Sequence, residues 1–323
     1  MRDMKKTAPS EYPEIRPGQS VELLKELHIL TRDGKLNQDS RRKLKQVYHL
    51  YQFIEPLLAQ VQQQKGNITL VDHGAGKSYL GFILYDLFFK AMEHQHQSSR
   101  AVEVQGARSG ANETYLEGRR GSEHRATQQF DRAVDSSHIY GIETRAELVT
   151  HSLELAQRLG FPGMSFLNLS VAESITSAAL PAQVDVVTAL HACNTATDDA
   201  IRFALAKRAQ HIVLVPCCQA EVAAMLRKHK AQALKNPLAE LWRHPIHTRE
   251  FGSHLTNVLR CLQLEAHGYQ VTVTELVGWE HSMKNELIIA SDKNLPRHKA
   301  AQRLRELLQS VGLEELSGRF FTE

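Results

Sequence analysis

The spacing of hydrophobic residues changes once along the chain, near Gly66. Between residues 40 and 64, apolar side chains recur every three or four positions, which is the period of an amphipathic helix. They are Leu44, Val47, Tyr48, Tyr51, Ile54 and Leu58. A second helical run precedes a break at Asp33 and Gly34, and residues 1–20 contain three prolines. We therefore expect residues 1–65 to form a flexible tail, up to residue 20, and a helical extension.

Beyond Gly66, short runs rich in β-branched residues alternate with helical runs. We expect strands at residues 68–71, 138–143, 164–169, 184–190, 211–216, 270–277 and 285–291, and helices at 78–93, 145–159, 198–209, 220–232 and 251–267. Buried strands that alternate with helices predict a parallel sheet. The last two strands are too close in sequence for a parallel crossover, so they should pair as an antiparallel hairpin. The predicted class is α/β, with a mostly parallel seven-stranded sheet, an antiparallel last strand and a helical tail at 293–323.

Composition narrows the classes of protein. There are 39 Lys and Arg against 36 Asp and Glu, a net charge of +3, so any surface that binds a polyanion must be local. No apolar run is long enough to span a membrane, and no apolar run follows the basic start as in a signal peptide. Four cysteines form no C-x-x-C pair, and two of them are adjacent. These features predict a reduced, cytoplasmic compartment without a metal site.

The segment LVDHGAGKSYLG, residues 70–81, raises the question of a phosphate-binding loop. A nucleotide-triphosphate loop needs a glycine five positions before Gly76, but Val71 stands there, inside the expected strand. The dinucleotide fingerprint needs a third glycine where the chain has Tyr79. What remains is a strand, Asp72, two glycines at positions 74 and 76, and a helix. Two glycines in that place allow the backbone to pass close to a ligand.

This pattern resembles the first motif of class I S-adenosylmethionine-dependent methyltransferases, and the Rossmann-like strand order resembles their fold over about residues 66–292. More narrowly, the chain is similar to a methyltransferase-domain group with a G-x-G-K loop, a His-x-Cys after strand four and paired cysteines after strand five. The resemblance implies S-adenosylmethionine as cofactor. It implies contacts from Asp72, Gly74, Gly76 and Lys77 at the methionine end, Glu143 at the ribose, and Ser170 and Glu173 near the adenine. His191 would lie beside the adenine or the methionine.

One departure from the family concerns the position of Glu143. The family reaches its ribose-binding acid about 20 residues beyond the glycines, whereas residues 94–137 are inserted here. The assignment of Glu143 therefore depends on the predicted strand 138–143. The insertion is rich in Gly, Ser, Gln and charged residues and poor in aliphatic ones, so it does not order itself easily. It is expected to leave the sheet near the cofactor pocket, so it is either a lid over the cofactor or a solvated loop.

Four residues near the ends of strands four and five are candidates for catalysis. His191 is either a general base or a hydrogen-bonding partner of the cofactor. Cys217 and Cys218 either line the pocket or include a nucleophile that attacks a pyrimidine ring. A zinc site with His191 is disfavoured, because adjacent cysteines point in different directions. Gln219 has an amide that suits the edge of a base.

The acceptor of the methyl group is predicted from two basic segments. One is 41–45, and the other is 227–249, within a longer stretch, 222–260, that contains seven Lys or Arg residues. Basic segments on both sides of one catalytic domain favour nucleic acid, and RNA (tRNA or rRNA) in particular. The alternatives are a protein or small-molecule methyltransferase, or an inactive fold that serves as a binding module.

Overall fold

The computed structural model describes residues 14–93, 137–190, 194–216, 219–228, 237–276 and 286–321. They include a seven-stranded sheet in the order β3-β2-β1-β4-β5-β7-β6. The strands are β1 (Thr69–His73), β2 (His138–Glu143), β3 (Met164–Asn168), β4 (Val186–Leu190), β5 (His211–Val215), β6 (Tyr269–Glu275) and β7 (Glu286–Asp292). The first five pair in parallel, and β7 is antiparallel to both β5 and β6. The predicted fold class and the terminal hairpin are confirmed.

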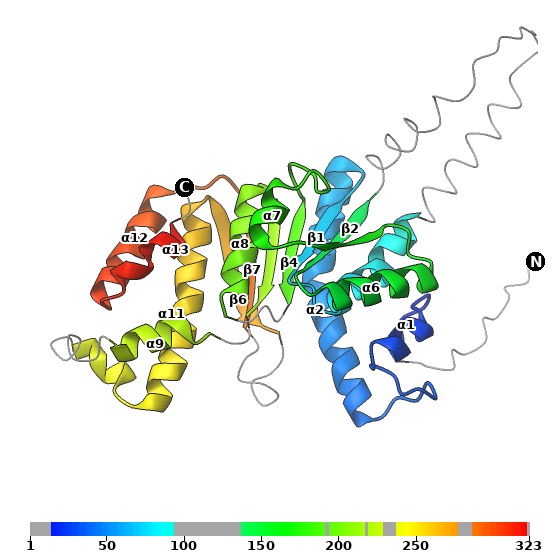
Figure 1. Cartoon of the computed structure of the whole chain (residues 1–323), viewed down its shortest axis with the longest axis horizontal. Coiled ribbons are helices and arrows are strands. Elements are labelled where there is room, and N and C mark those ends of the chain that lie inside the picture. Colours follow the sequence, from blue (N-terminus) through cyan, green and yellow to red (C-terminus); the bar gives the residue numbers. More distant parts are fainter. Residues whose placement is uncertain are drawn as a thin grey trace, which may run out of the picture.

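The helices pack on both faces of the sheet and beyond its β6 edge (Figure 1). They are α1 (Val21–Glu26), α2 (Gln38–Lys65), α3 (Tyr79–Leu84), a π turn η1 (Tyr85–Phe89), α6 (Ala146–Leu159), α7 (Val171–Thr176), α8 (Ala196–Ala206), α9 (Glu221–Lys228), 3-10 helices η2 (Pro237–Trp242) and η3 (Glu314–Leu316), α11 (Pro245–Ala266), α12 (His298–Ser310) and α13 (Ser317–Phe320). Leu70 packs toward α2, α3 and α6, while Val71 packs toward α8. Successive side chains of β1 therefore point to opposite faces of the sheet, and both faces are covered by helices.

The long helix α2 shares a hydrophobic core with the sheet. The side chain of Asn37 caps its start by accepting from Ser40 N at 2.8 Å, and Gly66 ends it in the left-handed region, with φ of 79°. Its buried residues contact the same core cluster as Leu70. Burial against the sheet explains why this helix is stable despite Pro56 in its interior.

The flexible tail predicted for residues 1–20 is wrong for residues 14–20. Ile15 is buried, and the guanidinium of Arg16 lies over the rings of Tyr48 and Tyr51, at 4.9 and 4.7 Å from their centroids. These cation–π contacts attach residues 14–20 to α2, although the sequence of this segment has no apolar periodicity. Residues 1–13 lie outside the described residues.

The two residues that flank the insertion lie at the amino ends of the parallel strands, opposite to their carboxyl ends. Residues 94–136 lie outside the described part, but Glu93 and Ser137 flank them. Ser137 Oγ accepts from Ile68 N at the start of β1, and Glu93 accepts from Tyr85, whose hydroxyl accepts from Gly163 N just before β3. Our premise that the insertion leaves the sheet beside the cofactor pocket is therefore wrong, because a segment that precedes a parallel strand enters at its amino end. Residues 94–136 themselves lie outside the described residues, so the choice between a lid and a solvated loop stays a prediction.

Several predicted helix ends are shifted. The helix expected at 251–267 begins earlier, since Pro245 occupies its first turn, where the missing N–H has no cost. The run expected at 78–93 contains the π turn η1 after α3. No helix among the described residues has the length and apolar content to cross a bilayer.

Candidate active site

A cavity opens at the carboxyl ends of the strands, beside the point where the strand order reverses between β1 and β4. Ligands of open α/β sheets bind at such switch points. The cavity has a volume of about 490 Å³. Its lining residues come from the ends of β1 and β2 and the starts of α7 and α8: His73, Gly74, Ile142, Glu143, Thr144, Arg145, Leu169, Val171, Ala196 and Asp199.

The glycine turn after β1 forms one wall. Gly74 and Gly76 have φ angles of 68° and 57°, a region that favours glycine. Gly76 N donates to Glu143 Oε2 at 2.8 Å, and Ala75 N donates to Ile142 O at 2.9 Å. The turn is thereby tied to the end of β2. Lys77 is exposed and does not line the cavity.

Asp72 lies beneath the turn rather than in the cavity. It is 2% exposed and accepts hydrogen bonds from Thr188 Oγ1 at 2.9 Å and Ser78 Oγ at 3.2 Å. Burial raises the pKa of Asp72 to about 6, against the effect of these hydrogen bonds. Asp72 therefore connects β1 to β4 and to the residue before α3, and it does not line the cavity.

The carboxylate of Glu143 is the most heavily bonded group of the cavity. It accepts from Gly76 N, from Thr144 Oγ1 at 3.3 Å, and from Arg145 through its backbone N at 3.1 Å and its Nε and Nη2, both at 3.0 Å. Burial alone would raise the pKa of Glu143, but the bonds and charge of Arg145 and the Gly76 amide outweigh burial and lower it to about 2. The side chain is ionised, and a solvent-exposed guanidinium occupies part of its bonding capacity.

Ser170 and Glu173 cap a helix instead of lining the cavity. Glu173 Oε2 accepts from Ser170 N at 2.7 Å and from Ser170 Oγ at 2.6 Å, which is a capping box at the start of α7. Their neighbours Leu169 and Val171 line the cavity in their place. The spacing of Ser170 and Glu173, S-x-x-E, is typical of such a cap, so the sequence already pointed to this role.

His73 is a cavity residue that the sequence analysis missed. It is 5% exposed, and within the described residues neither ring nitrogen has a hydrogen-bond partner. Burial lowers the pKa of His73 to about 4, although the charge of Glu143 opposes the shift. The imidazole is therefore neutral near pH 7 and lies 5.3 Å from the ring of Phe203, measured between ring centroids.

This shift predicts acid sensitivity. A folded-state pKa of about 4 against an unfolded value of about 6.5 means that the unfolded chain binds more protons between these values, so stability falls as the pH falls. Relative to wild type, His73→Leu should gain about 2 kcal/mol of unfolding free energy between pH 7 and pH 5. Urea unfolding at both pH values measures the difference. The exposed His151→Leu is the control, and a pH-independent difference for His73→Leu would contradict the prediction.

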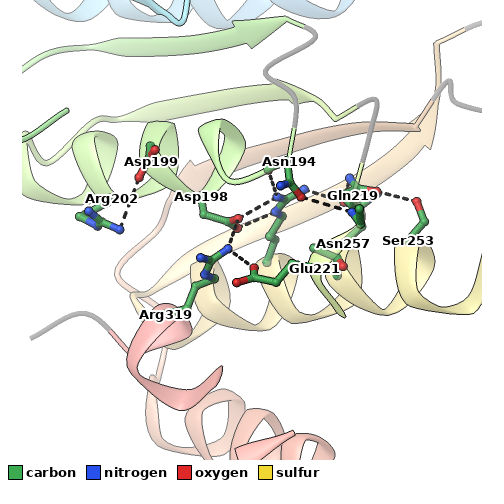
Figure 2. Close-up of polar contacts among 12 residues, drawn as sticks. Asn194, Asp198, Asp199, Arg202, Gln219, Glu221, Ser253, Asn257 and Arg319 are labelled. Atoms are coloured by element: carbon green, nitrogen blue, oxygen red, sulfur yellow. Dashed lines mark hydrogen bonds and ion pairs between the residues drawn. The ribbon is translucent and has the colours of Figure 1, made fainter. Parts of the chain in front are cut away.

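The candidate catalytic residues are only partly described. His191, Cys217 and Cys218 lie outside the described residues, and the hypotheses about them stay predictions. Gln219 is buried: its Nε2 donates to Asn257 Oδ1 at 2.8 Å, and its Oε1 accepts from Ser253 Oγ at 2.5 Å (Figure 2). In the described part of the chain, no three His, Cys, Asp or Glu side chains are grouped to hold a metal ion.

Comparisons with known proteins identify the family. The sequence matches the model of a family described as a methyltransferase domain over residues 42–133 and 123–225, which together cover more than half of the chain. No curated protein matches. Similar solved structures include an rRNA methylase from Streptococcus thermophilus (8% identity, 76% of this chain and 95% of that chain, TM-score 0.39). They also include magnesium protoporphyrin IX methyltransferase from Synechocystis PCC 6803 with bound SAH (12% identity, 84% and 94%, TM-score 0.37). The chain belongs to the methyltransferase-domain family and is an S-adenosylmethionine-dependent methyltransferase.

Proposed function

We propose that the cavity beside β1 holds S-adenosylmethionine and that the enzyme methylates RNA, tRNA or rRNA, in the cytoplasm. The observation that carries the cofactor site is the ionised Glu143 carboxylate, which lines a cavity at the switch point and is bonded to the glycine turn through Gly76 N. The family resemblance, including its paired cysteines, supports the same assignment. Protein and small molecules are the competing acceptors.

The residues present fit the cofactor. A volume of about 490 Å³ lies within the usual range of ligand pockets. The apolar Ile142, Leu169 and Val171 suit a flat adenine, and the fixed carboxylate of Glu143 suits ribose hydroxyls. Gly74 and Gly76 carry no side chain, so the backbone of the turn can pass close to the methionine end. S-adenosylmethionine supplies an electrophilic methyl group, so the protein mainly orients the acceptor.

Glu143→Ala should weaken S-adenosylmethionine binding by about 2 kcal/mol, the scale of a charge-assisted hydrogen bond. The ribose must share Glu143 with the Arg145 guanidinium, whose side chain is 60% exposed. Arg145→Ala therefore serves as the matched comparison, and it should leave affinity unchanged or tighter, since an exposed ion pair contributes little. Calorimetry measures both affinities. Equal losses in the two variants would mean that the ion pair shapes the site and that Glu143 does not bind the ribose.

The hypotheses for the residues outside the described part have direct tests. Cys217→Ser and Cys218→Ser should each leave substantial activity if the cysteines only line the pocket, as we propose. A covalent mechanism requires that one of them abolishes turnover while cofactor binding survives. His191→Asn should lower turnover if His191 is the general base. It should lower cofactor affinity if His191 is a partner of the cofactor.

The positions of the two basic segments support RNA. In the view of Figure 1, the amino-terminal end of α2 and helix α9 lie on either side of the point where β6 ends and β7 begins. Arg41 and Lys45 line a groove of about 460 Å³ on α2 together with Tyr48 and His49. Cationic and aromatic side chains in one groove suit phosphates and bases. Some of this charge is neutralised locally, because Arg41 pairs with Glu14.

Charge reversal on α2 tests the RNA interface. Arg42→Glu with Lys45→Glu should weaken binding to a structured RNA and lower the slope of log affinity against log salt by roughly 0.7–0.9 for each lost phosphate contact. Affinity for S-adenosylmethionine should not change. Filter binding at several salt concentrations measures the slope, with Lys299→Glu and Arg303→Glu on α12 as the control. Identical slopes for wild type and the α2 variant would remove α2 from the interface.

The acceptor class is tested by methyl transfer. Purified enzyme with tritiated S-adenosylmethionine should label total RNA from cells that lack the gene, and not total protein from the same cells. Label in protein alone would overturn the RNA proposal while leaving the cofactor site in place. Label only in the small-molecule fraction would do the same.

A further inference from the structure

A buried arginine on α11 contacts helix α8 and the segment that precedes it. Arg260 on α11 is 0% exposed, and its partner Asp198 on α8 is 6% exposed. Arg260 Nε donates to Asp198 Oδ1 at 2.7 Å, and Nη2 donates to Asp198 Oδ2 at 2.9 Å. A guanidinium that contacts both oxygens of a carboxylate fixes direction as well as distance.

The same guanidinium contacts the segment that follows β4 directly, and it reaches the segment that follows β5 through Asn257 of α11. Its Nη2 donates to the backbone oxygen of Asn194 at 2.9 Å, just before α8 begins. Its Nη1 donates to Asn257 Oδ1 at 3.2 Å, the atom that also accepts from Gln219 Nε2 at 2.8 Å. Asn194 Oδ1 in turn accepts from Ala220 N at 3.2 Å. One side chain therefore links the ends of two neighbouring strands.

The link continues to the wall of the cavity. Asp198 lies in the first turn of α8, between Ala196 and Asp199, and both of these line the cavity. A shift of Asp198 moves this turn and, with it, the cavity wall. Arg319 on α13 contacts Asp198 Oδ2 at 3.5 Å and also binds Glu221 at the start of α9, so the carboxylate is held from a second side (Figure 2).

Stability alone does not call for this arrangement. Replacing a buried ion pair by apolar residues of similar volume is often neutral or stabilising, because desolvation offsets the attraction between the charges. Apolar contacts have no preferred orientation, so an apolar pair would not fix the orientation of α11 relative to α8. The several fixed bonds of Arg260 instead set the relative position of α8, β4 and β5.

We propose that Arg260 is a positioning residue for methyl transfer. Through Asp198 it holds the first turn of α8 against the cofactor, and through Asn257 it holds Gln219 and the end of β5 in register with that turn. Gln219 then supports the acceptor side, with its amide committed to Asn257 and Ser253. The inference rests on the proposed cofactor cavity and is independent of the acceptor.

The test separates position from stability. The double variant Arg260→Met with Asp198→Leu removes both charges, so no charge of the pair is left unpaired. Its melting temperature should stay near that of wild type, while the Kd for S-adenosylmethionine rises about tenfold, the scale of losing groups that support a site. The control Arg319→Ala keeps the two-point contact and should leave the Kd within about twofold of wild type. An unchanged Kd in a folded double variant overturns the proposal.

A second variant decides the case if the double variant does not fold. Arg260→Lys keeps a charge beside Asp198, but an ammonium cannot reproduce the planar contacts to Asp198, Asn194 and Asn257 together. Its Kd should rise similarly, and a wild-type Kd in this variant overturns the inference. Failure of the cavity itself has a different signature: wild type then shows no binding, or Glu143→Ala binds as tightly as wild type, and the inference falls with the cavity. Absence of RNA labelling affects none of these measurements.

Discussion

Gly76→Arg is expected to reduce S-adenosylmethionine affinity by at least about a hundredfold while the chain stays folded. Gly76 has φ of 57°, and a Cβ there would lie 3.8 Å from Arg145 Nη2. An arginine side chain would leave from the cavity wall beside this guanidinium. Its charge would compete for Glu143, and its bulk would fill the space assigned to the methionine end. Calorimetry with S-adenosylmethionine measures the loss, and circular dichroism confirms folding.

The chain offers a matched control for this variant. Gly66 has φ of 79° with nothing within 4 Å of the position that a Cβ would take, and it ends α2 away from the cavity. Gly66→Arg carries the same added charge and a similar backbone cost of about 1 kcal/mol. It should bind S-adenosylmethionine like wild type. Normal binding by Gly76→Arg, or equal losses in both variants, would contradict the placement of the cofactor.

Gly252→Ala is expected to lower the free energy of unfolding by about 3 kcal/mol. Gly252 lies where α11 crosses α9, and a Cβ there would lie 2.7 Å from Ala223 Cβ, 2.7 Å from Ala223 N and 2.8 Å from Ala223 Cα. Two of these atoms belong to the backbone, so no side-chain rotation relieves the contact. Helix α9 must shift, which disturbs the cluster formed by Val222, Leu226 and the facing residues of α11. Urea unfolding measures the loss.

Gly318→Ala is the control for this substitution. Gly318 is also helical, with nothing within 4 Å of an added Cβ. The change should be neutral or stabilise by up to about 1 kcal/mol, because alanine is the better helix former. If Gly252→Ala matches this control, the two helices pack less closely than the structure shows.

The strands were predictable from sequence because their faces are buried on both sides and leave short apolar runs. Contacts between distant segments were not. Arg16 stacking on Tyr48 and Tyr51 leaves no local pattern, and neither does the pairing of Arg260 with Asp198, 62 residues apart. The Glu143 assignment relied on a predicted strand that the structure places at the same residues. His73 was missed because the first strand was predicted to end at residue 71, whereas β1 continues to His73 and buries its side chain.

The position of β7 affects the order in which the sheet can be completed during synthesis. β7 lies between β5 and β6, although β6 precedes it in the sequence. When β6 leaves the ribosome, its hydrogen-bonding partner has not yet been translated, and β5 still exposes an unpaired edge. Such pairings over long sequence separations form slowly and leave strand edges open to aggregation. The sheet is therefore completed only by a strand made after residue 285, and a nascent chain that stalls before it leaves the β5 edge exposed.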